Sequence, residues 1–116
     1  MPPVKSSQGT SLDSAYLTIE ILRGRWKLFI LQHLSDGPSR TGQLLRALDG
    51  VAKNRLNENL RELERLGILR RKTFPGRVQR VEYVLTPRGR SLTPVIESLH
   101  RWGAKNRALR RLLPNR

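Results

Sequence analysis

The polar side chains of residues 53–58 are the first candidates for chemistry in this sequence. Leu56 falls on the apolar stripe of a predicted helix, so its polar neighbours point away from that stripe. Lys and Arg can donate to guanine O6 and N7, Asn pairs with adenine N6 and N7, and Glu accepts from cytosine N4. The candidates for such base contacts are Lys53, Asn54, Arg55, Asn57 and Glu58. The alternative is an ordinary solvated polar face, which most helices carry.

A second group of candidates lies in the segment from residue 70 to residue 80, which has five basic residues and no acid. These are Arg70, Arg71, Lys72, Arg77 and Arg80. A solvated hairpin usually mixes both signs of charge, so this bias favours contact with phosphates or a minor groove. Arg77 and Arg80 are preferred because they lie near the predicted turn, whereas an edge strand kept soluble by charge would explain Arg71 alone.

Three further residues extend this candidate surface. Arg61 lies further along the same helix as residues 53–58 and is expected to meet a phosphate. Arg40 and Thr41 begin the preceding helix, where backbone N–H groups commonly contact phosphate.

The charge of the chain supports a polyanionic partner. The 116 residues carry 23 Lys and Arg against 9 Asp and Glu, a net charge of +14. A protein that neutralises phosphates gains affinity from counterion release, so nucleic acid is the expected partner. A membrane surface is the other candidate, but no segment approaches the roughly 18 apolar residues of a spanning helix. Residues 1–10 lack the apolar core of a secretion signal and are expected to form a disordered N-terminal segment. The expected location is the cytoplasm, in association with the nucleoid.

Other chemistries find little support in the residue inventory. The chain has no cysteine, which excludes a disulfide, a thiolate metal site and a thiol redox switch. His33 and His100 are far apart and have no partner at ligand spacing, so no metal site is predicted. The acids are dispersed, and the sequence has neither a nucleophile elbow nor a phosphate-cradling glycine loop. We therefore expect neither an enzyme nor a bound cofactor.

Hydrophobic spacing predicts the helices that position these residues. They are expected over residues 13–22, 25–34, 41–48 and 52–66. In the last of them, Leu56, Leu60 and Leu63 form a narrow apolar stripe. Gly67 lies where a helix C-cap glycine belongs.

A hairpin and a further helix follow these four. Residues 68–73 and 81–86 are predicted to be paired strands around a loop at residues 74–80. The last helix begins near Pro87, and Pro94 in its interior predicts a kink or a restart. This order of helices and strands predicts a mainly α protein with a small β-hairpin, which is the α+β arrangement of a winged helix-turn-helix.

Four ordered motifs of this chain match a known pattern. They are GRWKLFILQHLSDGPSR, LLRALDGV, LNENLRELERLGILRR and RVEYVLTPRGRSLTPVIESLHRWG. On these motifs the chain resembles the HxlR-type winged-helix transcriptional regulators of bacteria and archaea over about residues 17–103. The resemblance implies a DNA-binding regulator whose recognition helix, residues 52–66, enters the major groove. It also implies a wing at residues 74–80 that lies against the DNA backbone or minor groove.

The resemblance further implies a homodimer that pairs through its first and last helices and reads a pseudo-palindromic operator. The expected interface residues are Leu17, Ile21, Leu92, Val95, Ile96, Leu99 and Trp102. A hydrophobic content of 37% with 5% aromatics is lean for a free-standing core, which favours apolar burial between subunits. Trp26 and Trp102 are expected to anchor the core and the interface. Residues 11–103 would form this domain, and residues 104–116 a basic tail.

Departures from the family pattern bear on function. Many members carry a cysteine at the start of the first helix, where this chain has Leu-Asp-Ser at residues 12–14, so thiol sensing is excluded. Where the family commonly has a serine, this chain has Ala52, which weakens the helix cap. Where the family has a polar amide, it has Glu58, which alters the base edge that could be read.

Two other classes of binding protein are the alternatives. A sequence-independent nucleoid-binding or RNA-binding winged helix needs only the positive charge. Readers of single-stranded RNA stack bases on exposed aromatics, of which this chain offers Tyr16, Tyr83, Phe29 and Phe74, with Phe29 expected to be buried. A protein-interaction module is disfavoured by the uninterrupted basic wing. An unidentified small-molecule effector near the dimer interface is a further candidate partner.

Overall fold

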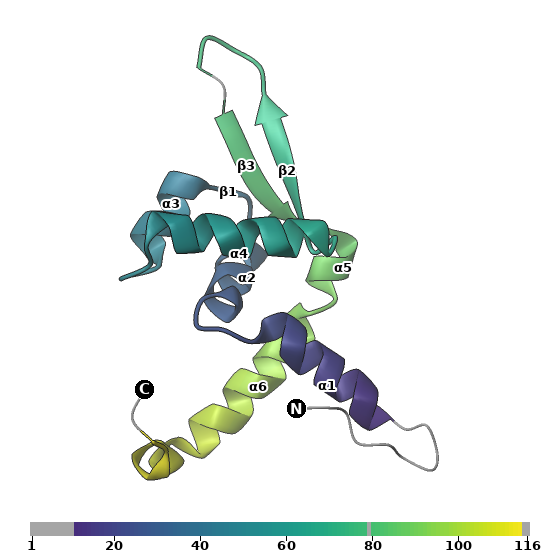
Figure 1. Ribbon diagram of the computed structural model, residues 1–116, viewed down its shortest axis with the longest axis vertical. Coiled ribbons are helices and arrows are strands. Elements are labelled where there is room, and N and C mark those ends of the chain that lie inside the picture. The colour runs from purple at the N-terminus through teal and green to yellow at the C-terminus, as the bar shows by residue number, and fades with distance from the viewer. Residues whose placement is uncertain (1–10, 79, 115–116) are drawn as a thin grey trace.

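The computed structural model describes residues 11–114 except residue 79. The molecule is elongated, with extents of 57 × 35 × 23 Å. A β-hairpin projects from one end, helices form the middle, and two helices diverge at the other end (Figure 1). The predicted disordered N-terminal segment, residues 1–10, lies outside the described residues.

The order of helices and strands confirms the predicted fold class. The helices are α1 (Ser11–Leu22), α2 (Lys27–Ser35), α3 (Thr41–Ala47), α4 (Lys53–Arg65), α5 (Pro87–Arg90) and α6 (Thr93–Lys105), followed by a 3-10 segment η1 (Arg107–Leu112). The strands are β1 (Ser39–Arg40), β2 (Leu69–Phe74) and β3 (Arg80–Leu85). The first four helices and both strands of the hairpin begin and end within two residues of their predicted bounds.

The sheet has one strand that the sequence did not predict. Its order is β1-β3-β2, with both neighbours antiparallel to the central strand β3. Tyr83 of β3 faces Ser39 of β1 on one side and Arg71 of β2 on the other. Strand β1 is only two residues long, too short for an alternating pattern to mark it.

The core is built mainly from leucines of α2, α3 and α4 packed beneath the base of the hairpin. Leu56, Leu60 and Leu63 of α4 are fully buried, which confirms the predicted stripe. Leu44 of α3 and Ile30 of α2 meet the same cluster. These contacts position α4 across the middle of the molecule, with its opposite face toward solvent (Figure 1).

The predicted burial of Phe29 is wrong, because its side chain is 53% exposed. The buried face of α2 carries Ile30, Leu31 and Leu34, together with Lys27. At about 100° per residue this face lies opposite Phe29, so the side of α2 that meets the core is not the side that carries Phe29.

The end of α4 is held by the segment that follows the hairpin. Gly67 has a φ of +74°, which confirms it as the turn-forming glycine after the helix. The Thr86 hydroxyl donates to the Gly67 carbonyl at 2.6 Å, and Arg88 donates to the Leu66 carbonyl at 3.0 Å. Gly89 lies so close to the backbone that a Cβ there would stand 2.3 Å from the Ile68 oxygen. The threonine, arginine and glycine of α5 and its cap therefore set the angle between α4 and the hairpin.

The last predicted helix is two helices in the structure. Helix α5 ends at Arg90, and α6 restarts at Thr93 with Pro94 in its first turn, as the proline predicted. Helix α6 has no buried residue and diverges from α1 at the lower end of Figure 1. Among the described residues, no helix has the length and apolar character needed to cross a membrane.

Candidate nucleic-acid interface

The outward face of α4 brings most of the predicted base-contacting residues together. Lys53, Asn54, Arg55 and Glu58 are exposed, whereas Asn57 is half-buried beside the core. Ala52 caps the helix without a side-chain hydrogen bond, as its residue type predicted. The first N–H groups of α4 therefore have no capping side chain from Ala52 and can serve an outside acceptor such as a phosphate.

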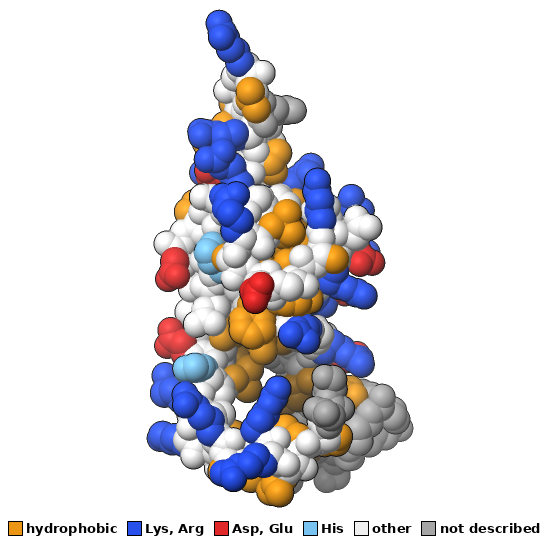
Figure 2. All heavy atoms as spheres, turned by 90° about the vertical axis from the view of Figure 1, so that its left-hand side faces the viewer, with side chains coloured by type: hydrophobic (Ala, Val, Ile, Leu, Met, Phe, Trp, Pro, Cys, Tyr) orange, Lys and Arg blue, Asp and Glu red, His pale blue; other side chains and the backbone are white. Residues whose placement is uncertain are grey.

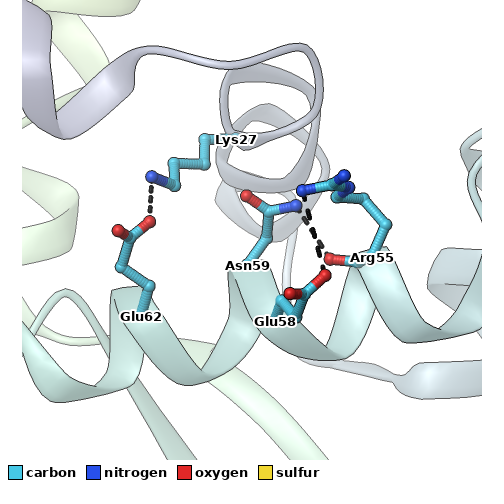
Figure 3. Close-up of polar contacts among 5 residues, drawn as sticks. All are labelled: Lys27, Arg55, Glu58, Asn59 and Glu62. Carbon is cyan, nitrogen blue, oxygen red and sulfur yellow. Dashed lines mark hydrogen bonds and ion pairs between the residues drawn. The ribbon is translucent and has the colours of Figure 1, made fainter.

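Polar contacts within the helix set the charge that this face presents. Arg55 lies 3.8 Å from the carboxylate of Glu58 one turn later, in an exposed pair that solvent screens (Figure 3). Asn59 donates to the Arg55 carbonyl at 2.8 Å, so this amide is engaged with its own helix. Asn54 takes part in no ion pair and no side-chain hydrogen bond that the structure describes, and its side chain is exposed. Of the candidates in the first two turns, Lys53 and Asn54 are thus the exposed residues without a described contact of either kind.

The hairpin carries the predicted basic wing. Arg77 is exposed in the connecting loop, and Val78 beside it is 79% exposed. Arg80 begins β3, with its guanidinium 5.5 Å from the centre of the Phe74 ring. In the space-filling view, Lys and Arg side chains extend from the tip of the hairpin down to the helices, with few acidic side chains among them (Figure 2). Arg77 is thus free of internal contacts that the structure describes, and Arg80 also stabilises the wing.

An ion pair joins the hairpin to α4. Arg71 of β2 lies 3.7 Å from Glu64, whose carboxylate points to the hairpin side of the helix. Arg71 therefore has a structural contact, which agrees with the structural alternative to DNA contact for this residue. Arg70 and Lys72 are exposed on the same strand.

The start of α3 is the third predicted contact point. Arg40 is exposed and Thr41 half-exposed, next to the central strand of the sheet. The Arg40 N–H donates to the Gln43 side chain at 2.8 Å. A phosphate at this position would therefore meet the Arg40 side chain and the later N–H groups of the helix, because the Arg40 N–H is already used.

The two histidines and the two tryptophans lie in different parts of the structure. His33 is half-buried in α2 and His100 exposed in α6, and no three His, Asp or Glu side chains in the described part of the chain gather as metal ligands. Trp26 packs against the core with Arg25 stacked 5.1 Å from its ring centre. Trp102 is 64% exposed in a single copy of the chain.

A largely apolar groove opens between α1 and α6. Its volume is about 610 Å³, and Ala15, Ile19, Leu22, Val95 and Leu99 line it. Leu17 is 57% exposed and lies on the opposite side of α1 from these lining residues. Of the predicted interface residues, Val95 and Leu99 therefore line this groove, whereas the other five do not. Sequence reasoning missed Leu12 and Ile19, which are each 60% exposed on α1.

Comparison with known proteins agrees with this geometry. The family described as HxlR-like helix-turn-helix matches residues 21–111. A Synechocystis protein named as an HTH-type transcriptional regulator is 42% identical over 86 residues, which are 74% of this chain and 64% of that relative. The regulator YtcD of Bacillus subtilis is 38% identical over 80% of this chain and 74% of its own length.

Solved structures of regulators superpose on this chain over most of its length. The redox regulator HypR in its reduced form superposes with a TM-score of 0.81 at 31% identity, over 86% of this chain and 99% of that one. A transcriptional regulator assigned to the MarR family from Enterococcus faecalis superposes with a TM-score of 0.79 at 34% identity, over 95% of this chain and 100% of the other.

Proposed function

The chain belongs to the HxlR-like helix-turn-helix family of transcriptional regulators, and we propose that it binds a pseudo-palindromic DNA operator as a homodimer. The observation that carries this proposal is the exposed polar face of α4 beside a basic hairpin. A helix and a wing of this kind match the two contact elements of a winged helix-turn-helix. The protein would act at the nucleoid in the cytoplasm, without catalysis, and we assign it no effector.

The proposed contacts divide into base reading and backbone positioning. Base edges in the major groove would meet Lys53, Asn54, Arg55, Asn57 and Glu58, of which Asn57 is half-buried and the other four are exposed. Phosphates or the minor groove would meet Arg40, Thr41, Arg61, Arg77 and Arg80. The Arg55–Glu58 pair supports a shared readout, in which the arginine and the carboxylate face one base step together.

The proposed dimer rests on the uncovered apolar surface of α1 and α6. Leu17, Val95, Leu99 and Trp102 are exposed in the single chain, at fractions from 38% to 64%. Large apolar side chains exposed on two neighbouring helices of a small protein support an association surface. Ile21, Leu92 and Ile96 are half-buried against the core and would complete the interface.

The second candidate function is sequence-independent binding to chromosomal DNA or RNA, which the net charge of +14 favours. Fluorescence anisotropy distinguishes the two functions. The upstream region of the chain's own gene is compared with a random duplex and a structured RNA at several salt concentrations. We expect one upstream fragment to be bound more tightly than the random duplex by about 10³-fold or more. Equal affinity for all three would favour the second function.

A further inference from the structure

A polar groove separates the α1–α2 connection from the outer side of α4. Its volume is about 470 Å³. Five cationic side chains line it: Arg23, Lys27, Arg55, Arg61 and Arg65. Two carboxylates, Glu58 and Glu62, lie among them. Of these residues, only Arg55, Arg61 and Glu58 are among the proposed DNA contacts already described.

Both carboxylates are already matched by a cation. Glu62 pairs with the ammonium group of Lys27, and Glu58 pairs with Arg55 at 3.8 Å. Within the described residues, Arg23, Arg61 and Arg65 have no carboxylate within ion-pair distance. Three unmatched guanidinium groups around one groove repel one another, and a bound polyanion relieves that repulsion.

Lys27 adds a buried positive charge to the groove. Its side chain is only 7% exposed, and a buried lysine is rare unless it is paired. Because Lys27 neutralises Glu62, that carboxylate does not oppose an anion in the groove. The same pair fixes the first turn of α2 against the third turn of α4, so Lys27 is a positioning residue for the site (Figure 3).

The length of α4 decides which part of DNA the groove can meet. Asn54, Glu58, Arg61 and Arg65 are spaced by three and four residues, so they form one outward stripe. At 1.5 Å per residue, Asn54 and Arg65 are about 16 Å apart along the axis. The major groove is about 12 Å wide, so a helix that reads bases at Asn54 reaches past the groove edge before Arg65.

We propose that this groove is a second DNA-backbone site, in which Arg23 and Arg65 bind phosphates of the strand that borders the major groove. The inference rests on the proposed DNA-binding function and extends its footprint toward α1. Guanidinium groups suit this role because their planar donors bind phosphate oxygens in pairs. Arg61 lies on this stripe between Glu58, a proposed base contact, and Arg65, a proposed phosphate contact.

The test is a salt titration of the double variant Arg23→Ala/Arg65→Ala on a random duplex and on the upstream fragment. The expected result is weaker binding to both, with the slope of log affinity against log salt reduced by about two per subunit. The matched control is Arg107→Ala/Arg110→Ala, which removes the same charge from the exposed η1 segment. We expect the control to change the slope little. Thermal unfolding followed by circular dichroism checks that both variants remain folded.

Three outcomes separate this inference from the proposed function. If the control flattens the slope as much as the test variant does, general charge explains the loss and the backbone site is refuted. If the test variant binds as the wild type while Arg77→Ala weakens binding, the groove is refuted but DNA binding stands. If the wild-type protein binds no duplex, the proposed function itself fails.

A phosphate-level experiment gives an independent reading. Single methylphosphonate substitutions along the bound upstream fragment remove one phosphate charge at a time. Wild-type protein should lose affinity at a phosphate beside each half-site that Arg23→Ala/Arg65→Ala no longer senses. If every substitution weakens the wild type and this variant equally, the two arginines contact no phosphate and the inference is wrong.

Discussion

The ammonium group of Lys27 is buried against the carboxylate of Glu62, which joins the start of α2 to the outer side of α4. Few polar contacts link α4 to the helices behind it, and this one lies on the side that faces the α1–α2 connection (Figure 3). Glu62 is 48% exposed, so the pair combines a desolvated cation with a partly hydrated anion.

Replacing Lys27 with methionine should destabilise the protein while keeping the packing of the side chain. The change leaves Glu62 without its cation, and we expect the free energy of unfolding to fall by about 1–2 kcal/mol, less than for a fully buried pair. Urea unfolding measures this change. The double variant Lys27→Met/Glu62→Gln should regain most of the loss, because it leaves no unmatched charge. A double variant less stable than the single one would contradict this account of the pair.

Adding one methyl group at Gly89 should loosen the junction between α4 and the hairpin. A Cβ at this position would stand 2.3 Å from the Ile68 oxygen, so the backbone must shift, at a cost of about 1–3 kcal/mol. The matched control is Gly103→Ala in the exposed part of α6, where a Cβ would meet nothing within 4 Å. That change should stabilise by up to about 1 kcal/mol, because alanine favours a helix. Equal melting temperatures for the two variants would refute the close approach at Gly89.

Charged residues on α6 should abolish the proposed dimer. Leu99 is 52% exposed and Trp102 64% exposed, and the double variant Leu99→Asp/Trp102→Asp would place carboxylates in the apolar surface. Light scattering should show a wild-type dimer at micromolar concentration and a monomeric variant. Val78→Asp, at a residue 79% exposed on the wing, should leave the dimer intact. A monomeric wild type would refute the dimer.

Oxidants and thiol-reactive electrophiles should leave DNA affinity unchanged on short exposure. The chain has no cysteine, so it has no thiol for these reagents to modify. DNA binding before and after treatment with diamide is the measurement. A rapid loss of binding that a reductant reverses would contradict this prediction.

The parts of this fold that follow a strong local pattern could be predicted from the sequence. The leucine stripe of α4 is one, because Leu56, Leu60 and Leu63 recur at helical spacing and all prove fully buried. The turn at Gly67 and the restart at Pro94 are others, since both residue types restrict the backbone directly.

The features that depend on tertiary contact could not be predicted in this way. Strand β1 has two residues and exists because β3 offers it hydrogen-bonding partners. The exposure of Phe29 depends on which side of α2 meets the core, and helical spacing predicted the wrong side. Arg23 and Arg65 are 42 residues apart in sequence, and only folding brings them to one groove. The signal that could have suggested them is the continuation of the outward stripe of α4 beyond Arg61.

We propose that α4 reads bases while the wing binds the backbone, and two variants separate these roles. Asn54 and Arg77 are the cleanest residues to change, because Arg55 also pairs with Glu58 and Arg80 also stacks on Phe74. Both single variants, Asn54→Ala and Arg77→Ala, keep the fold because both side chains are exposed.

The most direct measurement is a salt titration of these two variants and the wild type on the upstream fragment and on random duplex. Arg77→Ala should weaken binding to both DNAs and flatten the salt slope by about one per subunit. Asn54→Ala should lose roughly 1–3 kcal/mol of discrimination per contacted base, with much less effect on random duplex. If Asn54→Ala instead weakens both DNAs equally and flattens the salt slope as Arg77→Ala does, then α4 binds the backbone only and the claim of operator reading is contradicted.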